Sequence, residues 1–409
     1  MAKRKKKINT THLQKIGAAQ HRNEFISKFK QLLDDITDSK ISNCFPISVF
    51  DEIYELRNRP VYVRAADGQI ISKKILEEFS YLVAQILRDK KFKIGYGKVN
   101  EMIAHDFFTY GITLATHLKD LYSSNYLHDL ELKNKLVEFA AFTESDEFEK
   151  IWKEYNDMTF ALGLMFSELS NKMYVINNEN KTDVDGKVGL RICMDIYSLE
   201  TEKINILIDG KNRPAYKVGL PHLLPIPHFE YITIKSEQLS LEPNQLYEVY
   251  IQTHALDRLI ERIDNIFVGL LHLMMYHSFK NLKFCKDTNG NYLFEFSIRD
   301  FKVGYFRGDI VDGKIIIRTF LFLINNGTPE YEKLHANTGI EKEDTIYLAI
   351  NKLSAFISSD IRNNKRAKEI FVNAGCESLF GLDSNIMYSV DGLGKKTNAE
   401  LILNYLKLL

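Results

Sequence analysis

The chain has 409 residues, 54 Lys and Arg against 54 Asp and Glu, and therefore a formal net charge of zero. This length predicts two or three domains. The balanced charge excludes a polycation that coats nucleic acid along its whole length, and it excludes an acidic disordered chain. The four cysteines, Cys44, Cys193, Cys285 and Cys376, have no close spacing, so the sequence indicates neither a zinc knuckle nor a disulfide framework.

Residues 1–20 are basic and polar, and no apolar core of a signal peptide follows them. We expect a flexible tail there, either solvated or in contact with a nucleic-acid backbone. The longest apolar stretch, residues 266–279, is interrupted by His272 and His277 and is shorter than the roughly 20 residues that cross a bilayer. The sequence therefore predicts a cytoplasmic protein that does not contact a membrane.

Hydrophobic periodicity divides the rest of the chain and predicts an α+β fold. Residues 21–170 have helical spacing and form a helical module, with helices expected at 99–122, 130–142 and 147–169 and a short hairpin at 60–70. Residues 171–245 alternate with period two and predict a β-rich domain or extension. Residues 336–409 predict a helical C-terminal segment.

Between these parts, residues 246–335 predict a smaller α+β domain with a helix followed by an antiparallel sheet. A strand is expected at 247–251, a helix at 253–263 and a second helix at 265–279. The strands that follow are expected at 282–285, 292–298, 301–306 and 315–323.

The helix expected at 253–263 carries a pattern typical of an anion site. His254, Arg258 and Arg262 have i, i+4, i+8 spacing, which puts them on one helix face. His254 lies in the first turn, where free N–H groups and the helix dipole attract anions. The two arginines repel each other unless an anion lies between them, which suggests a phosphate. Alternatively, Asp257 and Glu261 neutralise them as ordinary surface pairs.

This segment resembles the barnase–EndoU–colicin–RelE-like superfamily of metal-independent endoribonucleases, which includes many bacterial toxins. The likeness covers residues 246–335 and is carried by His254, Ala255, Arg258 and Arg262, which match a His-Ala-x-x-Arg-x-x-x-Arg helix. By this resemblance Thr319 is a further catalytic residue on a late strand.

The resemblance implies an enzyme that needs no metal and no cofactor and that cleaves RNA through attack of the 2′-hydroxyl, leaving a 2′,3′-cyclic phosphate. His254 would be its base or acid, Arg258 and Arg262 would hold the phosphate, and Tyr305 and Arg318 would contact the substrate. An antitoxin or regulatory protein would be the partner in a toxin or phage-defence setting. The helical module would then serve target recognition, self-association into a homo-oligomer or partner docking.

The alternative is a non-enzymatic scaffold or nucleic-acid-binding protein that uses Arg258 and Arg262 as a phosphate clamp. Cleavage would depend on His254, whereas binding would need only the arginines.

Other motifs in the sequence give weaker indications of a functional site. The five-residue spacing of His272 and His277 is not that of a helical metal pair, and the glycine-containing segment 391–396 lacks the pattern of a phosphate-binding loop. The basic run 362–368 predicts either a solvated helix end or a contact with an RNA backbone.

Overall fold

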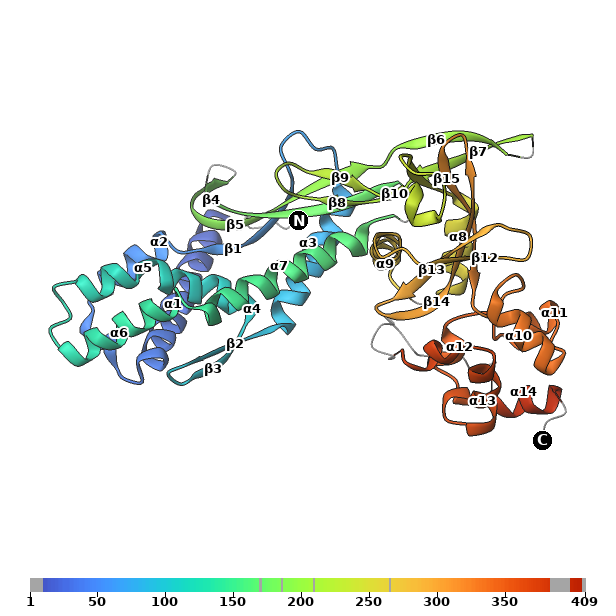
Figure 1. Ribbon diagram of the computed structural model, residues 1–409. Helices are drawn as coiled ribbons and strands as arrows, with labels where there is room; N and C mark the ends of the chain where they lie inside the picture. Colours follow the sequence, from blue (N-terminus) through green and yellow to red (C-terminus); the bar gives the residue numbers. More distant parts are fainter. Residues whose placement is uncertain are drawn as a thin grey trace, which may run out of the picture. The chain divides into compact units, whose positions relative to one another are not determined.

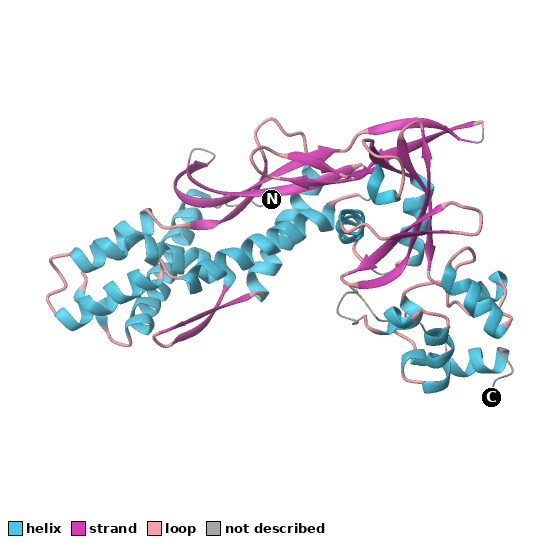
Figure 2. Ribbon diagram, viewed as in Figure 1, coloured by secondary structure: helices cyan, strands magenta, loops and turns pink. Residues whose placement is uncertain are grey.

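The computed structural model describes residues 10–168, 171–184, 187–208, 210–264, 266–382 and 398–406. With 48% helix and 28% strand, arranged as helices with mixed and antiparallel sheets, it confirms the α+β class (Figures 1 and 2). The chain forms two compact units. Unit 1 comprises Met1–Phe160 and Ile176–Tyr197, and unit 2 comprises Ala161–Val175 and Ser198–Leu409. In the described parts of the chain, no helix combines the length and the apolar character needed to cross a membrane.

Unit 1 is mainly helical, as its periodicity predicts. Phe25, Phe29 and Leu33 are buried on one face of the first helix, where they pack with Phe50 and Leu118 from later helices. The helices are α1 (Thr10–Thr37), α2 (Ile47–Glu55), α3 (Lys73–Asp89), α4 (Ala104–Asp106), α5 (Ile112–Ser123), α6 (Leu130–Phe142) and α7 (Asp146–Phe166), with short helical turns η1 (Ile41–Cys44) and η2 (Phe107–Gly111).

Two expectations for unit 1 are wrong, and a third is wrong for the part of it that the structure describes. The expected tail at residues 1–20 is helical from Thr10 onward, while its first nine residues lie outside the described part of the chain. The expected hairpin at 60–70 is one strand, β1 (Arg59–Ala65), which pairs in parallel with β5 (Lys187–Glu200). The expected helix at 99–122 begins as β3 (Val99–Ile103), paired with β2 (Lys91–Tyr96). The errors at 60–70 and 99–122 both involve strand pairing, which local periodicity does not encode.

Unit 2 is built on a mixed sheet of eight strands. Its order is β12-β13-β14-β15-β11-β7-β6, with β10 also paired to β11. The only parallel pair among these described strands is β11 with β15, and the other pairs are antiparallel. The bounds are β6 (Lys203–Ile208), β7 (Lys211–Lys217), β10 (Thr233–Lys235), β11 (Leu246–Gln252), β12 (Phe284–Lys286), β13 (Tyr292–Ile298), β14 (Phe301–Val311) and β15 (Lys314–Phe322).

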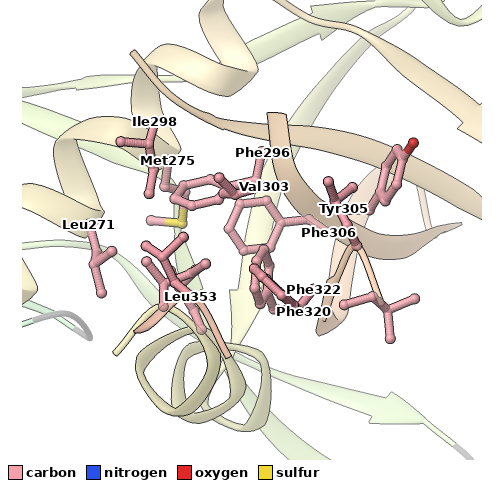
Figure 3. Packing of buried hydrophobic residues seen from close by; sticks show 14 of the residues in the cluster. Leu271, Met275, Phe296, Ile298, Val303, Tyr305, Phe306, Phe320, Phe322 and Leu353 are labelled. Carbon is pink, nitrogen blue, oxygen red and sulfur yellow. The ribbon is translucent and has the colours of Figure 1, made fainter. Parts of the chain in front are cut away.

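Two helices follow β11 and cover the sheet. They are α8 (Thr253–Arg262), which packs on β15, and α9 (Val268–Lys280), which packs on β13. Figure 3 shows Met275 of α9 among Phe296, Phe306 and Phe320 of the sheet, all fully buried. The predicted order of strand, two helices and then an antiparallel meander is therefore present, and it places α8 beside the middle of the sheet.

The remaining elements of unit 2 flank this sheet. The β8–β9 hairpin (Gly219–His222 and His228–Tyr231) and η3 (Ser236–Leu239) precede β11. The C-terminal helices share one hydrophobic core with the sheet, so the expected segments 171–245, 246–335 and 336–409 all contribute to unit 2. These helices are α10 (Pro329–Thr338), α11 (Lys342–Tyr347), α12 (Ser354–Ile357), η4 (Asp360–Arg362), α13 (Lys365–Asn373), η5 (Glu377–Phe380) and α14 (Ala399–Tyr405).

Candidate functional site

Helix α8 begins directly after β11 and presents two unlike faces. Ala255, Leu256 and Leu259 are buried in the core of unit 2. On the other side His254 is exposed, and Arg258 and Arg262 are partly exposed. Burial of the apolar positions fixes the rotation of the helix about its axis. The histidine and both arginines therefore face the same pocket.

The pocket has a volume of about 580 Å³ and lies entirely within unit 2. It extends along α8, because His254 and Arg262 both line it and lie eight residues, or about 12 Å, apart along the helix axis. Its walls come from β7, β11, α8, β14, β15, α11 and the loops around residues 325 and 351. The lining residues are Arg213, Gln252, His254, Arg258, Glu261, Arg262, Arg307, Arg318, Thr319, Leu321, Asn325, Asn326, Lys342, Thr345, Ile346 and Asn351.

The lining is strongly cationic although the whole chain is neutral. Five arginines and one lysine face the pocket, against one carboxylate, Glu261. Neither Arg213 of β7 nor Arg307 of β14 has a hydrogen bond or ion pair with another described residue. Like charges gathered in one concave site repel each other and focus a positive potential, so the pocket favours an anionic ligand.

A β-bulge in β15 brings two neighbouring residues to the same pocket. Thr319 pairs with Arg307, and Ile317 pairs with the next residue of β14, Gly308, so Arg318 is the extra residue. Neighbouring side chains of a regular strand point to opposite faces, and a bulge changes that alternation. Arg318 and Thr319 consequently both line the pocket. Asp309 forms an ion pair with Arg318, with 2.5 Å between Oδ2 and Nε, and this pair orients the guanidinium.

The two arginines of α8 already have partners. Arg258 forms an ion pair with Glu261, which is the surface pairing that the sequence left open. Arg262 donates from Nη1 to the main-chain carbonyl of Phe320. Burial, followed by the nearby charge of Arg258, lowers the pKa of Arg262 to about 10. An anion beside Arg262 would offset both effects, because a guanidinium has five N–H donors and this bond uses one of them.

Gln252 is a neutral, buried residue of the same pocket. It is the last residue of β11 and only 3% exposed, yet its side-chain nitrogen has no hydrogen-bond partner among the described residues. It lines the pocket beside the first turn of α8. A buried donor without an acceptor costs about 1–3 kcal/mol. A ligand oxygen in the pocket would provide the missing acceptor.

The structure brings together five of the six residues singled out from the sequence: His254, Arg258, Arg262, Arg318 and Thr319. Tyr305, the expected substrate contact, does not line this pocket. It is 2% exposed and lies among the buried side chains of the core (Figure 3). Its hydroxyl donates to Glu330 at 3.0 Å. Burial, and then the charge of Glu330, raise the pKa of Tyr305, so it is a neutral part of the core.

Ten lining residues were missed from the sequence: Arg213, Gln252, Arg307, Leu321, Asn325, Asn326, Lys342, Thr345, Ile346 and Asn351. Arg307 could have been found, because it is two residues from Tyr305 and shares its face of β14. Arg213 is far from α8 in sequence, and only the pairing of β7 with β11 brings it near. No local signal marks Gln252 or Lys342.

Other polar candidates have structural partners. His272 is buried, with Nε2 2.6 Å from the carbonyl oxygen of Gly219, as expected for a core histidine. In the basic run 362–368, Arg362 donates to the carbonyls of Phe380 and Leu382 and so joins two segments of the C-terminal region. The segment 391–396 lies outside the described residues. Within the described ranges, no three His, Cys, Asp or Glu side chains cluster in a way that could hold a metal ion.

Comparison with known proteins gives no relative from which a function could be transferred. No protein-family model, curated protein or solved structure matches the chain.

Proposed function

We propose that the chain is a metal-independent endoribonuclease whose active site is the pocket along α8. The observation that carries this proposal is the convergence of His254 with Arg258, Arg262, Arg318 and Thr319 in one cationic pocket. An imidazole is the side chain best suited to exchanging protons near neutral pH, and His254 is the imidazole among the residues that line the pocket. The resemblance of the α8 motif to ribonuclease toxins agrees with this proposal.

The chemistry requires three tasks, and the pocket offers a group for each. His254 takes the proton of the 2′-hydroxyl, and the 2′-oxygen then attacks phosphorus. The negative charge of the resulting phosphorane is stabilised by Arg262 and Arg318, with the Thr319 hydroxyl and the Gln252 amide donating to its oxygens. The bond from phosphorus to the 5′-oxygen breaks, and that oxygen takes the proton from His254. The products are a 2′,3′-cyclic phosphate and a 5′-hydroxyl.

The proposal is tested by incubating single-stranded RNA with the wild type, His254→Ala and Arg318→Gln in EDTA. We expect discrete cleavage by the wild type, a loss of at least a hundredfold in His254→Ala as is typical of a lost general base, and an intermediate loss in Arg318→Gln. His277→Ala is the matched control, because His277 lies on α9 away from the pocket and should leave the rate unchanged. Cleavage that depends fully on Mg²⁺ would contradict the proposal.

A second candidate function is phosphate binding without cleavage. It is favoured by one observation, the five arginines and one lysine in the pocket lining, because binding a phosphate needs only cations. RNA that shifts on a native gel equally well with the wild type and His254→Ala, and that stays intact with both, would establish the clamp instead.

A further inference from the structure

The pocket along α8 has two chemically different ends. At the end near the first turn of α8 lie Arg213, Gln252 and His254, with Arg318 from the bulge nearby. At the far end, beyond Arg262, the lining comes from the segment after β15, from α11 and from the loop before α12. The main-chain N–H of Leu353 donates to the carbonyl oxygen of Arg262 at 2.9 Å, which holds that loop against the end of α8.

Neutral side chains dominate the far end. Asn325, Asn326 and Asn351 contribute three carboxamides, and Leu321 and Ile346 contribute apolar surface. Asn325 uses its side-chain oxygen to accept from the N–H of Phe322 at 2.8 Å, which leaves its amide nitrogen to donate. The side chains of Asn326 and Asn351 have no hydrogen bond with any described residue.

Carboxamides and phosphates are poorly matched in one respect. A phosphate offers only acceptors, and cations already supply many donors in this pocket, whereas each carboxamide presents one donor group and one acceptor. The edge of a nucleobase has donors and acceptors side by side, and its face is apolar. A cluster of carboxamides next to Leu321 and the 57% exposed Ile346 therefore matches a base better than it matches a phosphate.

We propose that this neutral end is a nucleobase subsite, which binds one unpaired base of the RNA while the phosphate next to that base lies at Lys342. The inference rests on the proposed function, because it assumes that the ligand is RNA. It makes Asn326 and Asn351 specificity-determining residues. It also requires single-stranded RNA, because the base edge of a duplex is already occupied by pairing.

The test measures binding apart from cleavage. A single-stranded oligonucleotide with 2′-deoxy sugars throughout has no nucleophile, and it is compared with copies that lack one base at each position in turn. We expect one abasic position to weaken binding to the wild type about tenfold, since a good base contact contributes about that factor. The same abasic copy should bind Asn351→Leu and Asn326→Leu as well as the intact oligonucleotide does. Asn404→Leu, an exposed change on α14, should behave as the wild type.

Two results would overturn the subsite. One is equal affinity of the wild type for the intact and all the abasic copies, and the other is no binding of the intact copy. The melting temperatures of both asparagine variants are measured to check that these variants fold. Asn351→Ser is a second, smaller change at the same position. RNA cleavage in a parallel reaction decides the proposed function separately. An enzyme that cuts RNA without any base discrimination would retain that function and lose this subsite.

Discussion

Gln252 is a buried amide that the folded protein leaves without an acceptor. We predict that Gln252→Met, an unbranched apolar replacement, raises the free energy of unfolding by about 1 kcal/mol, because an unsatisfied donor is removed. Pyrophosphate is a small anion that can serve as a probe of the cationic pocket. The same change should weaken pyrophosphate binding about tenfold, which is the usual effect of losing one hydrogen bond to a charged group. Denaturant unfolding and a binding titration measure the two effects.

Gln245→Met is the control for this prediction. Gln245 is exposed, and its side chain accepts from the Tyr247 hydroxyl at 2.9 Å outside the pocket. It should leave pyrophosphate affinity unchanged. If Gln252→Met instead lowers stability and keeps the affinity, Gln252 is a structural residue and the account of its side chain is wrong.

The residues of the site differ in how far the sequence reveals them. His254, Arg258 and Arg262 are found from helical spacing alone, because a helix face is a local property. Thr319 and Arg318 are placed by the resemblance, and their shared orientation depends on a bulge that no sequence pattern signals. Arg213 and Gln252 become neighbours through the pairing of β7 with β11. The same resemblance implied that Tyr305 contacts the substrate, and its burial against Glu330 removes it from the site.

The pairing of β14 with β15 is the element that supports the site, and Gly304 is its tightest point. A Cβ at Gly304 would overlap the carbonyl oxygen of Leu321 and the ring of Phe320. We predict that Gly304→Ala lowers the free energy of unfolding by about 1–3 kcal/mol through overpacking. It should also weaken pyrophosphate binding, because Phe320 supplies the carbonyl to which Arg262 donates. Chemical denaturation and titration are the measurements.

Gly17→Ala provides the matched comparison. Gly17 lies in α1 of unit 1, with no atom near the position that a Cβ would take. This change should stabilise the protein by about 0.5–1 kcal/mol, because alanine has the higher helix propensity. Equal effects at the two glycines would refute the close contact between β14 and β15.

Some helices were predicted correctly from the sequence, whereas several strands were not, because strand pairing depends on distant residues. The helices at 130–142 and 253–263 match α6 and α8, since amphipathic periodicity over three turns is a strong local signal. The helix expected at 99–122 starts as a strand because the pairing of β3 with β2 outweighs its local preference. The parallel pairing of β1 with β5 joins residues more than a hundred positions apart, so it cannot be derived from either segment alone.

At the scale of the whole molecule, every lining residue of the pocket belongs to unit 2. A ligand that binds only the folded state stabilises it, by about 2.7 kcal/mol at a hundred times its dissociation constant. We predict that pyrophosphate raises the melting temperature and slows hydrogen exchange in α8 and β15, while exchange in α1 and α2 stays unchanged. Hydrogen-exchange mass spectrometry measures this distribution.

Arg307→Gln should remove this local protection, whereas Arg88→Gln, an exposed change on α3, should retain it. The pair of variants separates a bound anion from the general stabilising action of phosphate salts, which would act on both variants alike. Protection that spreads evenly over both units, or that persists in Arg307→Gln, would show that the pocket is not the anion site.

The proposed reaction begins with attack by the 2′-hydroxyl of the substrate RNA, and a single 2′-deoxy substitution in that RNA tests this step. The wild type is given an RNA with a mapped cleavage site and the same RNA with a single 2′-deoxy sugar on the 5′ side of that bond. We predict that the first is cut to a 2′,3′-cyclic phosphate and a 5′-hydroxyl, and that the second resists cleavage at that bond alone. Continued cleavage of the deoxy-substituted bond, with 5′-phosphate ends, would contradict the account.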